Sequence, residues 1–437
     1  MKKLNIAIIG LGNIGSYLYR YLQKNKNILA KKNNCIPNVV YVSAKNKNRK
    51  RGFKINNKIW LKNYLEATRI KKIDLIIELI GGSEGAAKKL VFSALKNKKN
   101  VVTANKALIA KYGDQLARIA EKNKVNLEFE AAVCGGVPII RSIKEGLIAN
   151  KINRIYGILN GTSNYILSNM TNSNKEFKDV LNEAKFHGYA ETNASSDLNG
   201  DDASSKIQIL SSLSFNCLIN RSNILVEGIS NIDRIDINNA KHLGYVIKHL
   251  AVAEVINQKL IQRVYPCMIK KTSYISNING VLNAVIIEGD PIGKFTIQGE
   301  GAGPGPTTSA LISDICSILR GNIKFPFSIP YKKRKKLKSL NISNEFFSSY
   351  IRLDVIDRTG VLSSITKVLS KNKISVKRLI QNPFRGKKYS SIIIISHKSK
   401  NLNLEKSIKE LHKKKYVISK PKFLRIEEIW TISTKNF

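Results

Sequence analysis

The sequence is poor in acidic residues and in cysteine. Its 437 residues contain 31 Asp and Glu against 74 Lys and Arg, which gives a formal net charge of +43. A charge this large raises the question of a nucleic-acid partner. The lysines are spread along the whole chain, however, without an Arg-rich arm or a helix-turn-helix signature. We therefore expect no nucleic-acid partner and interpret the charge as an enrichment of solvent-facing positions in lysine.

The few cysteines form no CxxC pair; they are Cys35, Cys134, Cys217, Cys267 and Cys316. An odd number of widely separated cysteines indicates reduced thiols in the cytoplasm and argues against a disulfide framework or a zinc site. No stretch reaches the ~20 apolar residues that a membrane span needs. The N-terminal run MKKLNIAIIGLGNIG is interrupted by glycines and lacks a cleavage site for a signal peptide. We expect no membrane partner.

A glycine motif, GLGNIG at residues 10–15, is the first chemical signal in the chain. It follows the apolar run LNIAIIG and precedes SYLYRYLQKN, so its context is strand, tight turn and helix. In that context the glycines let the turn close, let the backbone approach a pyrophosphate and let helix and strand pack closely. The motif predicts a dinucleotide site that includes Gly10, Leu11, Gly12, Asn13, Ile14 and Gly15.

The residues after this motif favour NADP(H) over NAD(H). A site selective for NAD carries an acid about 20 residues further on, which binds the ribose 2'-hydroxyl. The first acid of this chain is Glu66, and the basic run KNKNRKRG follows the second apolar run at residues 45–52. Lys45, Arg49 or Arg51 would hold a 2'-phosphate. The alternative is an ordinary basic surface segment.

Apolar runs continue to alternate with helical segments. Further strands are predicted within residues 73–82, 100–110 and 125–140. This alternation predicts a Rossmann-type, doubly wound parallel sheet in an α/β protein. Thr103, Asn105 and Lys106 follow a strand, and the carboxyl ends of strands are where ligands bind in such sheets.

A cluster of acids, GYAETNASSDLNGDDASSK at residues 188–206, stands out in the basic chain. One interpretation is a solvated loop that ends at a helix start, and it explains Asp201 and Asp202. It does not explain Lys206, which is four residues after Asp202 and so shares its helical face. Convergence of the four acids, with Glu191 and Asp197 beside Asp201 and Asp202, and of Lys206 on one site would suit an amino-acid substrate: acids for its ammonium group and a lysine to move a proton. With a nicotinamide site, they indicate hydride transfer at an amino alcohol.

Seven motifs in order resemble the homoserine dehydrogenase family. They are GLGNIG, the run ending in ELIGG, VVTANKALIA, FEAAVCGGVPII, LNGTSNYIL, the acidic cluster, and GEGAGPGPTTSALISDI. The resemblance implies interconversion of L-aspartate 4-semialdehyde and L-homoserine in threonine, methionine and isoleucine biosynthesis. The preceding residues alone leave two alternatives open: a dehydrogenase of another amino or hydroxy acid, and a sensor that has kept the fold without turnover.

The resemblance also implies roles for residues. Lys206 would donate and accept the substrate proton, with Asp202 orienting it and Lys106 as a second catalytic lysine near the nicotinamide. Such a lysine would need a pKa brought towards neutrality. Glu191 and Asp197 would hold the substrate amino group. The helix after GEGAGPG is expected to begin near Thr307. Further cofactor contacts are expected from Ala44, Lys45, Thr103, Lys106 and Gly303.

A monovalent cation, sodium or potassium, is a further implication of the resemblance. Its oxygen ligands would come from Glu130, Val133, Gly135 and Val137, the last three through their backbone carbonyls. The alternative is that Glu130 is an ordinary acid at the end of a strand.

The segment LNGTSNYIL is read as a turn and a helix capped by Thr162 or Ser163.

The C-terminal part has the order β-α-β-β-α-β, which is typical of a ferredoxin-like fold. It resembles an ACT domain, with Asp357, Thr359 and Gly360 at the ligand-binding turn. This implies threonine as an effector and a homodimer or homotetramer, and the alternative is a purely structural dimerisation module. We predict a monofunctional chain with four parts: an NADP-binding domain at 1–132 plus about 305–330, an α+β catalytic and dimerisation domain at 133–304, a basic linker at 331–347, and the ACT domain at 348–437.

Overall fold

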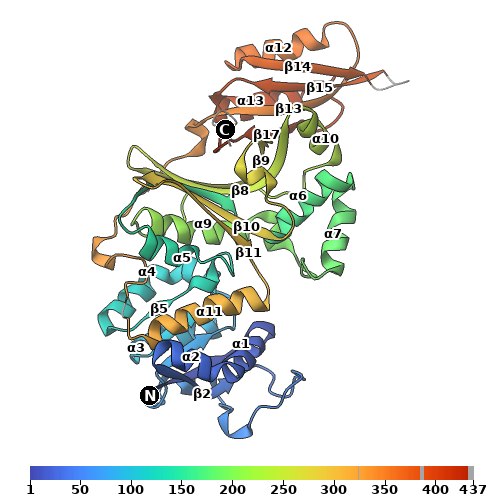
Figure 1. Ribbon diagram of the computed structural model, residues 1–437. Coiled ribbons are helices and arrows are strands. Elements are labelled where there is room, and N and C mark those ends of the chain that lie inside the picture. The colour runs from blue at the N-terminus through green and yellow to red at the C-terminus, as the bar shows by residue number, and fades with distance from the viewer. Residues whose placement is uncertain (323, 384–387, 432–437) are drawn as a thin grey trace, which may run out of the picture.

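The computed structural model describes residues 1–322, 324–383 and 388–431. Three bodies follow one another along the long axis of the molecule (Figure 1). A parallel sheet with its helices contains the N-terminus, a mixed sheet lies in the middle, and the C-terminal module caps the other end. Among these residues no helix is both long enough and apolar enough to cross a membrane.

The N-terminal sheet is parallel and five-stranded, with the order β2-β1-β3-β4-β5. Its strands alternate with helices along the chain, which confirms the predicted Rossmann-type topology. The last predicted strand is short, because the chain turns into a 3-10 helix at Glu130–Ala132. The strands are β1 (Lys2–Ile9), β2 (Cys35–Ser43), β3 (Leu75–Glu78), β4 (Asn100–Thr103) and β5 (Leu127–Glu128).

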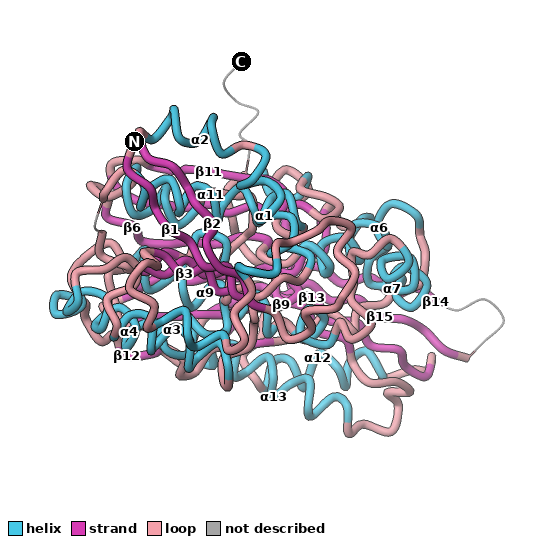
Figure 2. Tube along the Cα trace, turned by 90° about the horizontal axis from the view of Figure 1, so that it is seen from below, coloured by secondary structure: helices cyan, strands magenta, loops and turns pink. Residues whose placement is uncertain are grey.

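Helices cover both faces of this sheet. Ile6 and Ile8 of β1 pack into one apolar cluster, while the alternating Ala7 and Ile9 pack into another on the opposite face. Figure 2 shows α1, α2 and α11 on one side of the strands and α3 and α4 on the other. These helices are α1 (Asn13–Lys24), α2 (Lys26–Asn33), α3 (Ala86–Lys96), α4 (Lys106–Asn123) and α11 (Pro304–Leu319).

Helix α11 belongs to the first sheet although it follows the second domain in sequence. It packs against α1, so the chain returns to the N-terminal domain after residue 303. The helix begins at Pro304 rather than near Thr307, which corrects the predicted start. The reason is local: Gly303 adopts a φ of 109° as the N-cap, and Pro304 has the backbone angle that suits the first helical position.

The middle body is built on antiparallel strands of a 12-stranded sheet. These strands are β6 (Lys151–Ile158), β8 (Tyr245–Ile256), β9 (Lys259–Lys270), β10 (Leu282–Asp290) and β11 (Gly293–Glu300), with the short β7 (Leu225–Val226) beside β9. The helices of this body are α5 (Ile139–Arg141), which continues into a π-helical turn at Ser142–Gly146, α6 (Gly161–Ser173), α7 (Phe177–Phe186), α8 (Ser195–Asn199), α9 (Asp201–Ser214) and α10 (Arg234–His242).

The C-terminal module has the predicted β-α-β-β-α-β order, which confirms its fold. Its own elements are β13 (Phe346–Ile356), α12 (Val361–Lys371), β14 (Val376–Pro383), β15 (Tyr389–Ser396), β16 (Ser399–Lys400), α13 (Asn401–His412) and β17 (Lys422–Ile426). Its last strand, β17, pairs in parallel with β9 of the middle body. One sheet therefore runs through both bodies, and β12 (Lys338–Ser339), in the predicted linker, also pairs with β9.

Candidate active site

A cavity of about 640 Å³ lies where the N-terminal sheet faces the middle body. Its wall is built by residues from the ends of α1 and β4, from the first turn of α6, from the loop around α8, and from the segment after β11. These residues are Ile14, Ala104, Lys106, Ala131, Ala132, Cys134, Gly135, Asn160, Gly161, Thr162, His187, Gly188, Tyr189, Glu191, Asp197, Asp202, Lys206, Val281, Glu300, Gly301, Ala302, Gly303 and Thr307.

Lys206 and Asp202 form a buried ion pair on one face of α9. Lys206 Nζ lies 2.8 Å from Asp202 Oδ2, at the predicted spacing of one helical turn. The two residues are 8% and 5% exposed. Lys206 Nζ also donates a hydrogen bond to the carbonyl of Leu159 at 2.7 Å. The ammonium group is thus held in one place at the cavity wall.

Lys106 joins this pair from the other domain. It begins α4 immediately after β4, where Asn105 caps the helix by accepting a hydrogen bond from the backbone N–H of Leu108. Lys106 Nζ lies 2.9 Å from Asp202 Oδ1, so one carboxylate bridges two lysines from two domains. The side chain of Lys106 is 43% exposed and faces the cavity.

The charges of this group are strongly coupled. Burial alone would raise the pKa of Asp202, but the ammonium groups of Lys206 and Lys106 hold it well below its usual range. Burial alone would lower the pKa of Lys206, but Asp202 raises it above its ordinary value. These groups therefore do not bring the pKa of Lys206 towards neutrality, and its side chain is protonated at neutral pH.

The remaining acids of the cluster do not all reach the cavity. Glu191 and Asp197 line it, as expected. The Asp197 carboxylate accepts hydrogen bonds from Asn160 Nδ2 at 2.8 Å and from the Thr162 hydroxyl at 3.2 Å. Asp201 is exposed at the start of α9 and is not part of the wall, which corrects the expectation that four acids converge. Asp202 is already paired with Lys206 and Lys106, so Glu191 and Asp197 are the acids of the cluster left to meet a cationic group.

Two glycines of the GLGNIG turn have no room for a side chain. A Cβ on Gly10, whose φ is 108°, would lie 2.4 Å from the carbonyl oxygen of Leu79. A Cβ on Gly15 would lie 1.9 Å from the carbonyl oxygen of Gly10. Gly12 instead faces open space, where a phosphate group could approach the backbone. The turn has the shape that a dinucleotide pyrophosphate requires.

Only some of the other predicted cofactor residues line the cavity. Ile14, Lys106 and Gly303 line the cavity. Ala44 and Lys45 follow the end of β2, beside the glycine turn, whose Gly10 N–H donates to Ser43 at 2.9 Å. Thr103 is fully buried, and its hydroxyl donates to Glu78 Oε2 at 2.6 Å. Its side chain is therefore committed to the sheet.

Two arginines of the basic run lie against the glycine turn. Arg51 Nε donates to the carbonyl of Leu11 at 3.2 Å, and Arg51 Nη2 donates to that of Asn46 at 2.6 Å. Arg51 therefore shapes the loop. Arg49 Nη2 lies 3.4 Å from Asn13 Oδ1 and is exposed, which leaves its guanidinium available to a ligand at the turn.

The predicted cation ligands lie in the segment from Glu130 to Val137, whose Gly135 is part of the cavity wall. Glu130 Oε1 and Oε2 accept hydrogen bonds from the backbone N–H groups of Ile140 and Arg141 at 2.8 and 2.7 Å. Burial raises the pKa of Glu130 to about 7. The carbonyl of Val137 accepts from Ile139 N at 2.8 Å. In the described part of the chain no group of three or more His, Cys, Asp or Glu side chains could hold a metal ion.

Asn160 is a site residue that the sequence did not single out. It is the N-cap of α6, since its Oδ1 accepts from Ser163 N at 2.8 Å, and this corrects the predicted cap at Thr162 or Ser163. Its Nδ2 donates to both Asp197 Oδ1 and Asp202 Oδ2, at 2.8 and 2.9 Å. The high preference of Asn for N-cap positions was the available signal. Its bridging role depends on contacts between distant segments.

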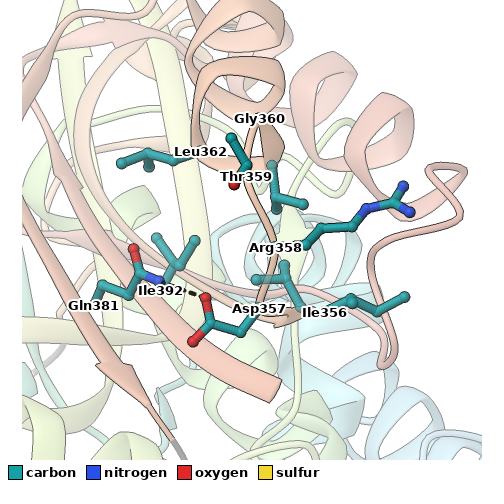
Figure 3. Close-up of a pocket in the computed structure, with 10 residues that line it drawn as sticks. Ile356, Asp357, Arg358, Thr359, Gly360, Leu362, Gln381 and Ile392 are labelled. Carbon is teal, nitrogen blue, oxygen red and sulfur yellow. Dashed lines mark hydrogen bonds between the residues drawn. The ribbon is translucent and has the colours of Figure 1, made fainter. Parts of the chain in front are cut away.

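A second cavity, of about 250 Å³, lies in the C-terminal module. Asp357, Thr359 and Gly360 line it together with Gln381 of β14 (Figure 3). Asp357 accepts hydrogen bonds from the Ser390 hydroxyl at 2.6 Å and from Gln381 Nε2 at 3.4 Å. The three residues predicted for an effector therefore share one small polar cavity at the start of α12.

A glycine turn at the edge of a parallel sheet, facing a buried lysine and carboxylate pair, defines a nicotinamide-dependent oxidoreductase. Family models agree: the homoserine dehydrogenase model matches residues 138–316, its NAD-binding domain 10–130, and the ACT domain 349–415. The homoserine dehydrogenase of Helicobacter pylori is 36% identical over 98% of this chain and 99% of its own. That of Neisseria gonorrhoeae is 36% identical over 93% and 95%.

Solved structures agree with these relatives. A homoserine dehydrogenase from Thiobacillus denitrificans superposes with a TM-score of 0.91 at 34% identity, covering 98% of this chain and 99% of that one. A hyperthermophilic archaeal homoserine dehydrogenase in complex with NADPH gives 0.62 at 25% identity, covering 72% and 97%. The chain belongs to the homoserine dehydrogenase family. The resemblance seen in the sequence motifs is confirmed.

Proposed function

We propose that the protein interconverts L-aspartate 4-semialdehyde and L-homoserine, in the synthesis of threonine, methionine and isoleucine in the cytoplasm. The observation that carries this is the Asp202 carboxylate, which bridges Lys206 and Lys106 at the junction of the two domains. The test is the absorbance of reduced nicotinamide during turnover of homoserine with NADP or NAD. Turnover of malate or lactate in place of homoserine would contradict the assignment.

Different residues of the cavity have different roles in this reaction. The nicotinamide supplies the hydride when bound. Glu191 and Asp197 hold the substrate ammonium group, because they are the carboxylates of the acidic cluster that line the cavity without an ion pair to a lysine of the described residues. Lys206 donates its proton to the substrate oxygen during reduction and takes it back during oxidation. Asp202 keeps Lys206 protonated and in place, and Lys106 adds positive charge beside the developing alkoxide.

The pH dependence of the reaction tests the role of Asp202. Because Asp202 raises the pKa of Lys206, Asp202→Asn is expected to lower that pKa. Oxidation needs neutral Lys206 as a base, so the rise of kcat/KM for homoserine with pH should move to lower pH in the variant. The measurement is kcat/KM against pH for both proteins. An unshifted profile with reduced amplitude would mean that another group limits the reaction.

NADP(H) is the preferred cofactor in this proposal. Support comes from the exposed guanidinium of Arg49 beside Asn13, and from the absence of an acid between residue 1 and Glu66. A 2'-phosphate at this turn would accept charge-assisted hydrogen bonds from Arg49 and from Lys45. The same positions would leave the 2'-hydroxyl of NAD without a carboxylate partner.

Reversing the charge of Arg49 is expected to weaken NADPH binding. A charged hydrogen bond contributes about 1.5–3 kcal/mol, so Arg49→Glu should raise the KM for NADPH roughly 10- to 100-fold. The KM for NADH should change little, since that cofactor lacks the phosphate. Steady-state kinetics with both cofactors measure this. Lys50→Glu, the same charge change at the neighbouring exposed residue, is the control, and an equal effect there would mean a general loss of positive potential.

The cation, the domains and the assembly complete the proposal. A sodium or potassium ion would be held by the backbone oxygens of Val133, Gly135 and Val137 together with Glu130. The NADP-binding domain spans 1–132 plus about 305–330, the catalytic domain 133–304, the linker 331–347 and the ACT domain 348–437. The chain assembles as a homodimer or homotetramer through the catalytic and ACT domains.

L-Threonine is the proposed effector of the C-terminal cavity. Its ammonium group would meet the Asp357 carboxylate, and its carboxylate would meet the backbone N–H groups at the start of α12. Wild-type protein should release or absorb heat with L-threonine in titration calorimetry. Asp357→Asn should weaken this binding roughly tenfold, because a charged hydrogen bond is lost.

Glu410→Gln on α13 is the matched control for this titration, since it changes a carboxylate of the same module that pairs with the exposed Lys371 and does not line the cavity. It should bind threonine as the wild type does. No heat with the wild-type protein, together with undiminished activity at millimolar threonine, would leave the module with a structural role.

A further inference from the structure

Lys248 of β8 is a buried lysine without an acidic partner. It is 2% exposed, and in the described part of the chain its Nζ forms no ion pair. Four oxygen atoms surround Nζ instead: Ile278 O at 2.6 Å, Asn279 Oδ1 at 3.0 Å, Asn164 Oδ1 at 3.2 Å and Ser168 Oγ at 3.4 Å. Burial lowers the pKa of Lys248 to about 7, and its amino group has at most three donors for such a set. Burying it carries a free-energy cost, so its place needs a reason.

Asn164 of α6 forms hydrogen bonds to the same segment, residues 278–282. It is 1% exposed, and its Nδ2 donates to the carbonyls of Ile278, Gly280 and Leu282 at 3.1, 3.0 and 3.2 Å. Lys248 and Asn164 are themselves hydrogen bonded through Asn164 Oδ1. Together they fasten residues 278–282, which lead into β10, onto β8 and α6.

This segment reaches the substrate cavity through Val281, which is part of its wall. The carbonyl of Val281 lies so close to the first turn of α6 that a Cβ on Gly161 would approach it to 2.7 Å. The same turn carries Thr162, which donates to Asp197, and it is capped by Asn160, which donates to Asp197 and Asp202. The position of residues 278–282 and the position of the acids are therefore linked through one helical turn.

We infer that Lys248 and Asn164 are positioning residues for the amino-acid substrate. They hold residues 278–282 against α6, so that Val281 and Thr162 keep fixed places in the cavity wall beside Asp197. The inference rests on the proposed function, because it assigns these residues to the homoserine subsite of that cavity. It predicts a loss of substrate affinity without a loss of cofactor affinity, since neither residue contacts the glycine turn.

The substitution Asn164→Asp tests positioning. Its carboxylate would accept hydrogen bonds from the Lys248 side chain, but the N–H donors to the three carbonyls are lost. We expect the KM for homoserine to rise roughly 10- to 100-fold, as a displacement of about 1 Å at a substrate site can produce. The KM for NADP should stay near that of the wild type. The melting temperature should fall, because the three buried carbonyls lose their donor.

Two further variants complete the test. Asn279→Ala removes one acceptor of Lys248 at an exposed position and should raise the homoserine KM several-fold even if Asn164→Asp does not fold. Lys271→Met removes an exposed lysine near the same segment and should change nothing. Unchanged homoserine KM in the folded variants would overturn the inference. A wild-type protein that does not turn over homoserine would instead overturn the proposed function.

Discussion

Replacing Lys206 by methionine is expected to lower kcat for homoserine oxidation by roughly 10²- to 10⁴-fold, the range that a positioned acid or base contributes. Methionine has nearly the length of lysine but cannot exchange a proton. The Lys206 ammonium is buried and fixed by Asp202 and by the carbonyl of Leu159, so water cannot readily take its place. Initial rates in both directions, with NADP and homoserine or with NADPH and the semialdehyde, measure the effect.

Lys106→Met distinguishes the two lysines that share Asp202. If Lys206 transfers the proton, Lys106→Met should cost less in kcat, because its half-exposed ammonium adds only electrostatic stabilisation. Lys185→Met, at an exposed position of α7, is the control for removal of a lysine and should behave as the wild type. A larger loss of kcat in Lys106→Met than in Lys206→Met would reverse the two roles.

The parts of the site that the sequence predicted are those with a local signature. GLGNIG encodes its own turn, and the spacing of four from Asp202 to Lys206 places both on one helical face. Lys106 follows a strand at the edge where ligands bind. Its contact with Asp202, at 2.9 Å, joins residues 96 positions apart and depends on how two domains pack. No spacing rule reports such a distance.

The direction in which the pKa of Lys206 is shifted could not be predicted from the sequence for the same reason. Burial and a nearby carboxylate move the pKa of a lysine in opposite directions, and which effect is larger depends on distances. Here Asp202 lies 2.8 Å away, and the pKa is raised.

The order of elements in the C-terminal module was predictable from periodicity, whereas the pairing of β17 with β9 was not, because any exposed strand edge could have been its partner.

The pairing of β17 with β9 places Glu427, a buried carboxylate of the C-terminal module, beside Arg154 and Arg263 of the middle body. Glu427, directly after β17, is 4% exposed. It accepts hydrogen bonds from Arg154 Nη2 at 2.5 Å, from Arg263 Nη2 at 2.7 Å and from the Tyr265 hydroxyl. Burial alone would raise the pKa of Glu427, but Arg263 and Arg154 hold it below its usual range. The carboxylate is therefore ionised in the folded protein.

Glu427→Gln is expected to lower the free energy of unfolding by roughly 1.5–3 kcal/mol, the cost of losing a charged hydrogen bond at Arg263, which keeps Glu254 as its second partner. The amide keeps the shape of the side chain but cannot neutralise Arg263. Urea denaturation followed by circular dichroism measures the loss. Because the folded pKa of Glu427 is lowered, its contribution is present above the unfolded pKa and is lost as pH falls through the folded pKa. The difference between wild type and variant should therefore shrink in acid.

Glu428→Gln, one residue further on, is the matched control for this experiment. Its carboxylate is 65% exposed and pairs, within the described ranges, with the exposed Lys398, and such surface pairs contribute about 0–1 kcal/mol. Equal unfolding free energies for the two variants would mean that solvent reaches Glu427 and that the junction is not sealed. A large loss of unfolding free energy confined to Glu427→Gln would mean that the C-terminal module and the middle body unfold as one unit, since the Glu427 carboxylate between them is then part of a common core.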